Sequence, residues 1–156
     1  MGLEELLKDK TKIDIGDICS AWQWAITDQK TVLLVTCFGD LFLIGPNDEI
    51  SWLETGSGKL TVVSENLDDF RQQLRNQENI DNWFLPSLYS ELKEAGITLK
   101  ENQVYSYKQF PSLGGEYIFE NIEPTDISVH FHLTGQISEQ IKDLPPGTKL
   151  KIDIEE

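Results

Sequence analysis

Short apolar runs alternate with a polar turn between Phe38 and Leu53. The two runs, Leu41–Ile44 and Ile50–Leu53, flank the segment Gly45-Pro46-Asn47-Asp48. Proline presets φ for a turn, while asparagine and aspartate tolerate the left-handed region and can bond their own backbone. The pattern predicts a β-hairpin closed by a loop of about four or five residues.

Further strands are predicted on both sides of this hairpin. The β-branched, apolar segment Thr31–Phe38 is typical of a central strand that is covered on both faces. After the hairpin, a turn at Gly56–Lys59 leads into a strand at Leu60–Val63. A run of about four or five successive strands joined by short turns indicates an antiparallel meander.

The segment that precedes these strands carries a mixed signal. Leu3, Leu6 and Leu7 share one helical face, which predicts a short amphipathic helix up to about Lys8. Residues 13–18, in which Gly-Asp interrupts three isoleucines, fit either a docking strand or an extended lead-in.

The hydrophobic period changes to a helical one at Asn66. Asn66 is a good N-cap, and Asp68 and Asp69 follow in the first turn, where the helix dipole favours acidic residues. Apolar residues then recur at helical spacing up to about Asn76. A further helix is predicted to begin at Pro86, because proline suits the first helical position, and to end at Gly96 as a left-handed cap.

The C-terminal third is predicted to return mainly to strands, at 105–107, 117–122 and 150–154. Apolar and polar residues alternate from 127 to 134, which favours a half-buried strand, with a helix as the second interpretation. A short helix is predicted from Ile137 to Leu144. These elements predict a single α+β domain over residues 1–156, with an antiparallel meander sheet followed by a helical segment and further C-terminal strand and helix elements.

The charge balance narrows the class of partner. Twenty-seven acidic residues against 13 lysines and arginines give a net charge of −14 and a pI near 4.4. Nucleic-acid backbones and anionic membranes attract positive surfaces, so neither is an expected partner. An acidic surface can serve solubility alone, or it can steer a basic protein partner.

The same sequence indicates a cytoplasmic protein. The N-terminus lacks the basic segment and long apolar run of a signal peptide, and no apolar run approaches the ~20 residues of a transmembrane helix. Cys19 and Cys37 lie among apolar neighbours and are then expected to remain buried thiols.

No catalytic or metal-binding motif is complete. Gly56-Ser57-Gly58-Lys59 lacks the Ser or Thr that follows the lysine of a phosphate loop, and Asn47–Glu49 does not continue into alternating calcium ligands. His130 and His132 would share one face of a strand, either as a metal pair or as two polar residues on the solvent side of an edge strand. We therefore expect no cofactor, no metal and no enzymatic activity.

A set of short motifs runs in order along the chain. Its members are Thr27-Asp28, Phe38-Gly39-Asp40-Leu41-Phe42, Leu113-Gly114-Gly115-Glu116-Tyr117, Asn121-Ile122, Gly135-Gln136-Ile137 and Leu144-Pro145-Pro146-Gly147-Thr148. From about Ile13 to its end, the chain thereby resembles the C-terminal domain of immunity proteins that guard bacteria against DNase toxins of the type VI secretion system. That domain was long catalogued as a domain of unknown function. Gly39–Phe42 and the turn and strand that follow are also similar to the immunity superfamily of SMI/KNR type.

Both resemblances imply an α+β binding module without catalysis. The first implies that the chain binds and neutralises a cognate toxin, and the second allows an adaptor with a housekeeping partner as the alternative. Because a DNase carries a basic cleft, we expect its immunity protein to cover it with an acidic face that also presents an exposed aromatic anchor. The candidate residues are Asp68, Asp69, Glu78, Asp81 and the aromatic anchor Trp83.

Overall fold

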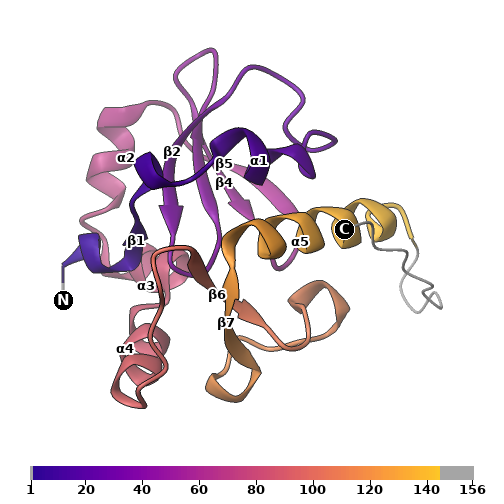
Figure 1. The fold of residues 1–156 in the computed structure, drawn as a ribbon. Coiled ribbons are helices and arrows are strands. Elements are labelled where there is room, and N and C mark those ends of the chain that lie inside the picture. Colours follow the sequence, from indigo (N-terminus) through magenta and orange to yellow (C-terminus); the bar gives the residue numbers. More distant parts are fainter. Residues whose placement is uncertain (1, 145–156) are drawn as a thin grey trace.

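The computed structural model describes residues 2–144, so the predicted last strand at 150–154 lies outside the described residues. Five antiparallel strands form one sheet in the order β1-β2-β3-β4-β5 (Figure 1). Their bounds are β1 Leu7–Lys8, β2 Thr31–Thr36, β3 Leu41–Ile44, β4 Ile50–Glu54 and β5 Lys59–Ser64. The predicted meander is confirmed.

The predicted hairpin forms β3 and β4, in the middle of this sheet. Phe42 pairs with Trp52 across the two strands. The turn is closed by the Gly45 N–H, which donates to the Glu49 carbonyl at 2.9 Å, and Asp48 takes the left-handed conformation with φ 64°. The four turn residues 45–48 and the apolar runs beside them therefore predict the positions of both strands correctly.

A second, two-stranded sheet consists of β6 Gln103–Tyr107 and β7 Ile122–Asp126. The Tyr105 N–H donates to the Cys37 carbonyl at 2.7 Å and thereby links β6 to the end of β2. The strand predicted at 117–122 is wrong: 3-10 turns occupy Pro111–Leu113 and Phe119–Asn121, and pairing starts only at Ile122. The loop before β7 instead satisfies its backbone through the side chain of Asn121.

In the described part of the chain, five α-helices pack around the sheets: α1 Ile15–Ser20, α2 Leu67–Gln73, α3 Gln77–Phe84, α4 Pro86–Glu94 and α5 Ile127–Ile141. The predicted caps are observed, since Asn66 Oδ1 accepts from the Asp69 N–H at 2.8 Å and Gly96 ends α4 with φ 80°. Toward the N-terminus, the predicted helix is a 3-10 turn, Leu3–Leu6, that leads directly into β1. Neither interpretation of residues 13–18 is correct, because Asp14 caps α1 there.

The strand predicted at 127–134 is also wrong, and the second interpretation holds. Asp126 Oδ1 accepts from the Val129 N–H and starts α5. Seven residues of α5 are buried, and they recur in groups three or four positions apart, which is helical spacing: Ile127, His130, Phe131, Thr134, Gly135, Ile137 and Ser138. The predicted helix from 137 to 144 is, up to Ile141, the C-terminal part of this element.

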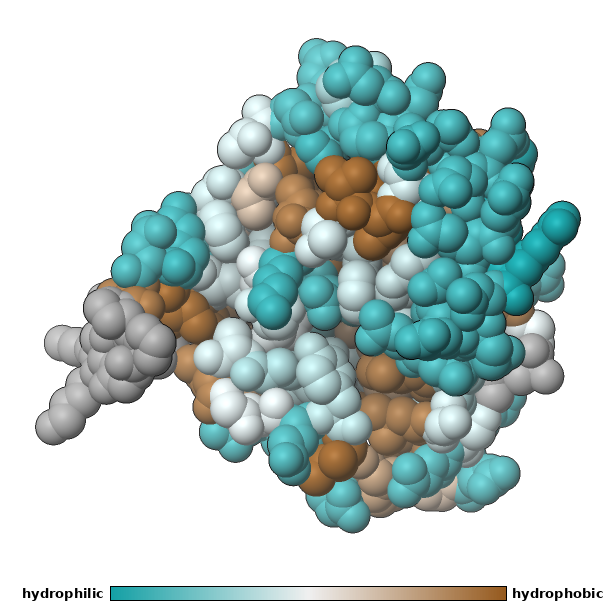
Figure 2. Space-filling view, turned by 180° about the vertical axis from the view of Figure 1, so that it is seen from behind, coloured by the Kyte–Doolittle hydropathy of each residue, from teal (hydrophilic) through white to brown (hydrophobic). Residues whose placement is uncertain are grey.

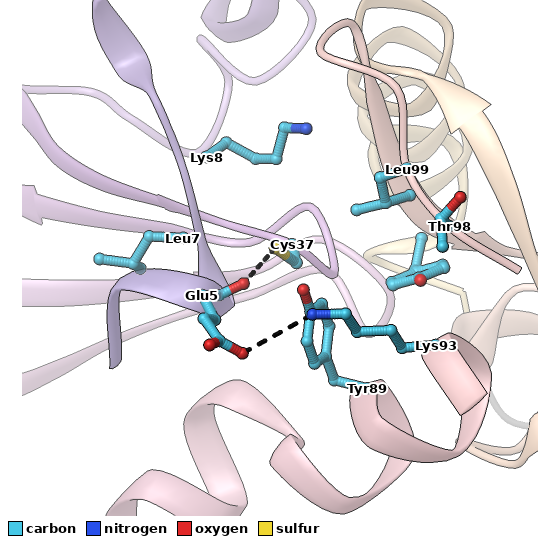
Figure 3. A pocket seen from close by; sticks show the side chains of 9 residues that line it. Glu5, Leu7, Lys8, Cys37, Tyr89, Lys93, Thr98 and Leu99 are labelled. Atoms are coloured by element: carbon cyan, nitrogen blue, oxygen red, sulfur yellow. Dashed lines mark hydrogen bonds and ion pairs between the residues drawn. The ribbon is translucent and has the colours of Figure 1, made fainter. Parts of the chain in front are cut away.

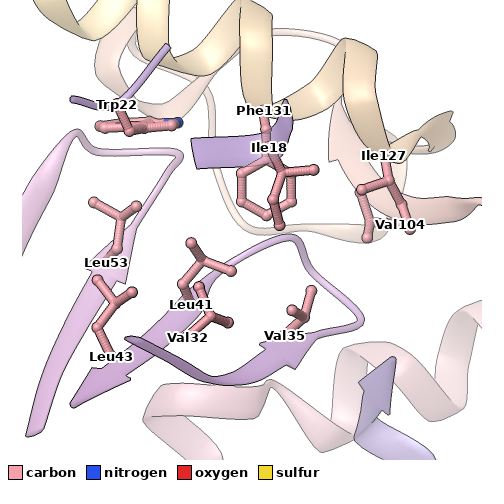
Figure 4. Packing of buried hydrophobic residues seen from close by; sticks show 10 residues of the cluster. All are labelled: Ile18, Trp22, Val32, Val35, Leu41, Leu43, Leu53, Val104, Ile127 and Phe131. Carbon is pink, nitrogen blue, oxygen red and sulfur yellow. The ribbon is translucent and has the colours of Figure 1, made fainter. Parts of the chain in front are cut away.

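The sheet is covered on both faces. On one face, Val32, Val35, Leu41, Leu43 and Leu53 pack against α1 and α5, with Ile18 and Phe131 between them (Figure 4). On the other face, Phe42, Ile50 and Trp52 pack against α2 and α3. Period-two alternation along β3 and β4 divides their side chains between these two cores. None of the helices between residues 2 and 144 combines the length and the apolar character of a membrane span.

Candidate functional site: an acidic protein-binding surface

Acidic side chains gather where α3 and α4 meet. Asp81 of α3 and Glu91 and Glu94 of α4 are exposed and line a shallow groove of about 470 Å³. Glu78 is exposed one turn before Asp81 on α3. The structure therefore brings one of the predicted carboxylates, Asp81, into one groove with two that the sequence patterns did not single out.

The other two predicted carboxylates, on α2, have local roles. Asp68 is exposed but pairs with Arg71 at 3.3 Å. Asp69 is half-buried, and its Oδ2 accepts from Gln73 Nε2 at 2.7 Å, while Gln73 also donates to the Val63 carbonyl. Asp69 thus orients a side chain that holds α2 on β5, and the arginine beside Asp68 makes the exposed face of α2 mixed in charge.

The predicted aromatic anchor is not exposed. Trp83 is only 5% exposed and lies in the aromatic cluster around Phe42, with ring centroids 5.4 Å apart. Its large apolar surface is buried in the hydrophobic core between α3 and the sheet. In this conformation, Trp83 therefore cannot contact a partner protein.

Hydrophilic residues dominate the side of the molecule on which α2 and α3 lie, which is the right-hand side of Figure 2. Hydrophobic residues reach this face in separate areas between hydrophilic ones. Apolar areas surrounded by hydrophilic ones are a common arrangement at protein–protein interfaces.

A buried polar cluster lies at the opposite side of the sheet from α2. His130 of α5 places Nε2 3.0 Å from the Gly39 carbonyl and 3.0 Å from Thr55 Oγ1, and its Nδ1 is 2.7 Å from Ser106 Oγ. Because a carbonyl only accepts, Nε2 carries the proton and Nδ1 accepts from Ser106. Asp40 Oδ1 accepts from the Thr55 N–H and hydroxyl, both at 3.0 Å.

This cluster explains the Gly39-Asp40 motif. Gly39 has φ 73°, and a Cβ there would lie 2.2 Å from His130 Nε2, so only glycine fits. The cluster ties the turns at 39–40 and 55 to β6 and α5, which are far apart in the sequence. It is therefore a structural lock between the meander and the C-terminal elements.

The lock contains a serine beside a histidine. In an accessible site, such a pair can act as nucleophile and base. Ser106 is 2% exposed and His130 is fully buried, which leaves no access for a substrate. Burial lowers the pKa of His130 to about 4, although its hydrogen bond to Gly39 opposes this shift. The imidazole is thus a weak base, and the arrangement favours a structural role.

A cavity of about 300 Å³ lies between β1, α4 and β6 (Figure 3). Its cations are already engaged: Lys93 Nζ is 3.9 Å from a Glu5 carboxylate oxygen, and Lys8 Nζ donates to the Lys100 carbonyl at 3.0 Å. The Cys37 thiol faces the Glu5 carbonyl, and burial raises its pKa to about 11. A thiol with that pKa is unreactive near neutral pH.

The two histidines do not share a face. His130 is in the buried lock, whereas His132 is half-buried and lies 3.0 Å from Asp17 Oδ1 on α1. Their predicted edge-strand geometry is wrong because both are on α5. Within residues 2–144, no three His, Cys, Asp or Glu side chains are grouped so that they could hold a metal ion.

The described residues thus form an α+β fold with acidic side chains exposed on its helices and with Ser106, His130 and Cys37 buried. Residues 64–138, just under half of the chain, match the family model described as T6SS immunity protein Tdi1, C-terminal. The match confirms the resemblance to immunity proteins of the type VI secretion system. It begins at the end of β5 and ends within α5, so it includes the acidic helices.

The solved structures with a similar fold include the crystal structure of Atu4351 from Agrobacterium tumefaciens, with a TM-score of 0.56 and 18% sequence identity. The similarity covers 80% of this chain and 65% of that one, so this chain spans about two thirds of the length of its structural neighbour. At this low sequence identity, the similarity shows a shared fold and nothing about function. The comparison with curated proteins found no match.

Proposed function

We propose that the chain is a non-catalytic immunity protein that binds a cognate toxin in the bacterial cytoplasm and neutralises it, and that this toxin is a DNase. The family match over residues 64–138 carries the proposal, because that family consists of type VI secretion immunity proteins. The net charge of −14 supports the DNase as target. A nuclease needs a basic cleft to hold phosphates, and an acidic protein can occupy such a cleft and associate with it quickly.

The experiment that tests this function is protection of living cells. The protein encoded by the adjacent gene is expressed in bacteria with and without this chain, and the purified pair is examined for a complex by size-exclusion chromatography. We expect survival and intact DNA only when both are present, and a complex at micromolar concentration. Unprotected cells together with no complex would refute the proposal.

The groove between α3 and α4 provides a charge test of the same function. The triple variant Asp81→Lys, Glu91→Lys, Glu94→Lys changes the net charge from −14 to −8. We expect its association rate with the nuclease to fall on the order of 10- to 100-fold at low salt, and by less at high salt, because steering is screened. Stopped-flow or surface-plasmon kinetics at two salt concentrations would measure the difference.

A matched control separates the groove from net charge. Asp28→Lys, Glu139→Lys, Asp143→Lys makes the same change of six charges at exposed positions, one between α1 and β2 and two at the C-terminal end of α5. This control should lose much less of the association rate. Equal losses in the two triple variants would show that the groove has no special role.

A further inference from the structure

The loop that precedes β7 exposes two adjacent hydrophobic residues. Tyr117 is 42% exposed and Ile118 is 44% exposed. Other exposed large hydrophobic residues in the described part of the chain, such as Val62 and Val129, lie singly on separate elements. Single exposed residues of this kind are ordinary, whereas an adjacent aromatic and aliphatic pair provides the core of a contact surface.

The backbone around this pair is held rigidly. Asn121 Nδ2 donates to the carbonyls of Gln109 and Glu116, each at 2.8 Å, and its Oδ1 accepts from the Gln109 N–H at 2.9 Å. Gly114 has φ 95°, and a Cβ at Gly115 would lie 1.8 Å from the Gln109 carbonyl oxygen. The loop is thus ordered before any partner arrives, which reduces the entropy cost of binding.

The ring of Tyr117 is held in place by packing against a buried residue. It packs edge-on against the buried ring of Tyr107, with centroids 5.5 Å apart and planes at 87°. The Ser112 N–H donates to the Gly56 carbonyl at 2.8 Å and fixes the loop to the turn between β4 and β5. Part of Tyr117 is therefore covered by the protein, and the exposed 42% faces solvent.

The surroundings of the pair are acidic and adjoin α4. Glu116, Glu120 and Glu123 are exposed, against the single cation Lys108 in residues 108–123. Phe119 packs into the hydrophobic cluster that includes Leu92 of α4. In Figure 1, α4 and this loop lie at the same end of the molecule, below the five-stranded sheet. The loop can therefore continue the acidic surface that begins in the groove between α3 and α4.

We propose that the loop 108–121 is part of the toxin-binding surface and that Tyr117, with Ile118 beside it, is its aromatic anchor. The partner that fits is a basic protein surface with an arginine or lysine next to an apolar depression, since a tyrosine face attracts cations and a carboxylate rim matches their charge. This inference rests on the proposed immunity function and deepens it by naming the contact.

The test measures binding of the nuclease-inactivated product of the adjacent gene by calorimetry. Tyr117→Ala should weaken the affinity by about 100-fold, as is typical for a central aromatic residue of an interface. Tyr117→Phe keeps the ring and its packing on Tyr107 and should stay within a few-fold of the wild type. The matched control Val62→Ala, at a position that is 63% exposed, should leave the affinity unchanged.

The outcomes separate this inference from the function on which it rests. If the wild type binds and Tyr117→Ala binds equally well, the anchor is refuted and the immunity function stands. If the wild type neither binds nor protects, the proposed function fails and the anchor fails with it. Should Tyr117→Ala not fold, hydrogen exchange of the wild-type complex decides: protection at 108–121 supports the anchor, and protection elsewhere alone overturns it.

Discussion

Phe42→Ala is expected to lower the free energy of unfolding by about 3–5 kcal/mol, the usual cost of truncating a buried phenylalanine. Phe42 is fully buried on β3, and its ring centroid lies 5.2 Å from that of Phe70, 5.4 Å from Trp83 and 5.6 Å from Phe84. These rings belong to α2 and α3, so the cavity would open between the sheet and both helices. Because the neighbouring aromatic rings are large and rigid, they cannot easily move in to fill the cavity.

Urea unfolding followed by circular dichroism would measure this loss, together with a fall in melting temperature on the order of 10 °C. Val62→Ala on β5 serves as the matched control, because its exposed side chain should change stability by less than about 0.5 kcal/mol. A melting temperature unchanged in Phe42→Ala would mean that this hairpin is not at the centre of the fold.

Asp40→Asn is expected to change how stability depends on pH. Burial raises the pKa of Asp40 to about 7, although its hydrogen bonds with Thr55 oppose the shift. Between about pH 4 and 7 the folded protein keeps a proton on Asp40 that the unfolded chain has lost. The contribution of Asp40 is therefore fully present below pH 4 and declines by about 4 kcal/mol as the pH rises to 7.

His130 has the opposite effect on the pH dependence of stability. Its pKa is about 4 in the folded protein and near 6.5 in the unfolded chain, so its contribution is present above pH 6.5 and is lost, by about 3 kcal/mol, as the pH falls to 4. In the wild type the two slopes largely cancel over this range. Asp40→Asn keeps an acceptor for Thr55 but cannot titrate, so its stability should rise by about 3 kcal/mol between pH 4 and 6.5.

Urea unfolding of both proteins at pH 4.5, 6.0 and 7.5 would reveal the two profiles. The wild type should vary little between the first two values and decline toward the third, while Asp40→Asn should gain stability throughout. Parallel profiles would show that Asp40 is already ionised in the folded protein near pH 5.

Local chemistry allowed much of the fold to be predicted. The hairpin at β3 and β4, the cap at Asn66 and the glycine end of α4 each depend on a few neighbouring residues, and each is observed. The error at 127–134 has an equally specific cause. His130 and Thr134 are polar and looked solvent-facing. His130 instead bonds distant segments, for example Gly39, which is 91 positions away, and Thr134 donates to the His130 carbonyl of its own helix.

The candidate surface was less predictable for the same reason. Asp81 was expected, but its position in one groove with Glu91 and Glu94 depends on how α3 and α4 pack. Trp83 and Tyr117 are both aromatic residues near acidic ones, and burial alone distinguishes them. Asn121 and the glycines before Tyr117 were the signal that could have indicated an ordered, exposed loop.

The four tryptophans divide into two pairs on opposite faces of the sheet. Trp22 and Trp24 stack at 5.5 Å beside α1 and α5, while Trp52 and Trp83 lie 6.4 Å apart in the core beneath α3. Each layer of the fold therefore carries its own intrinsic fluorophores. Replacing one pair with phenylalanine would let emission from the other pair report when that layer alone forms or comes apart, without any attached dye.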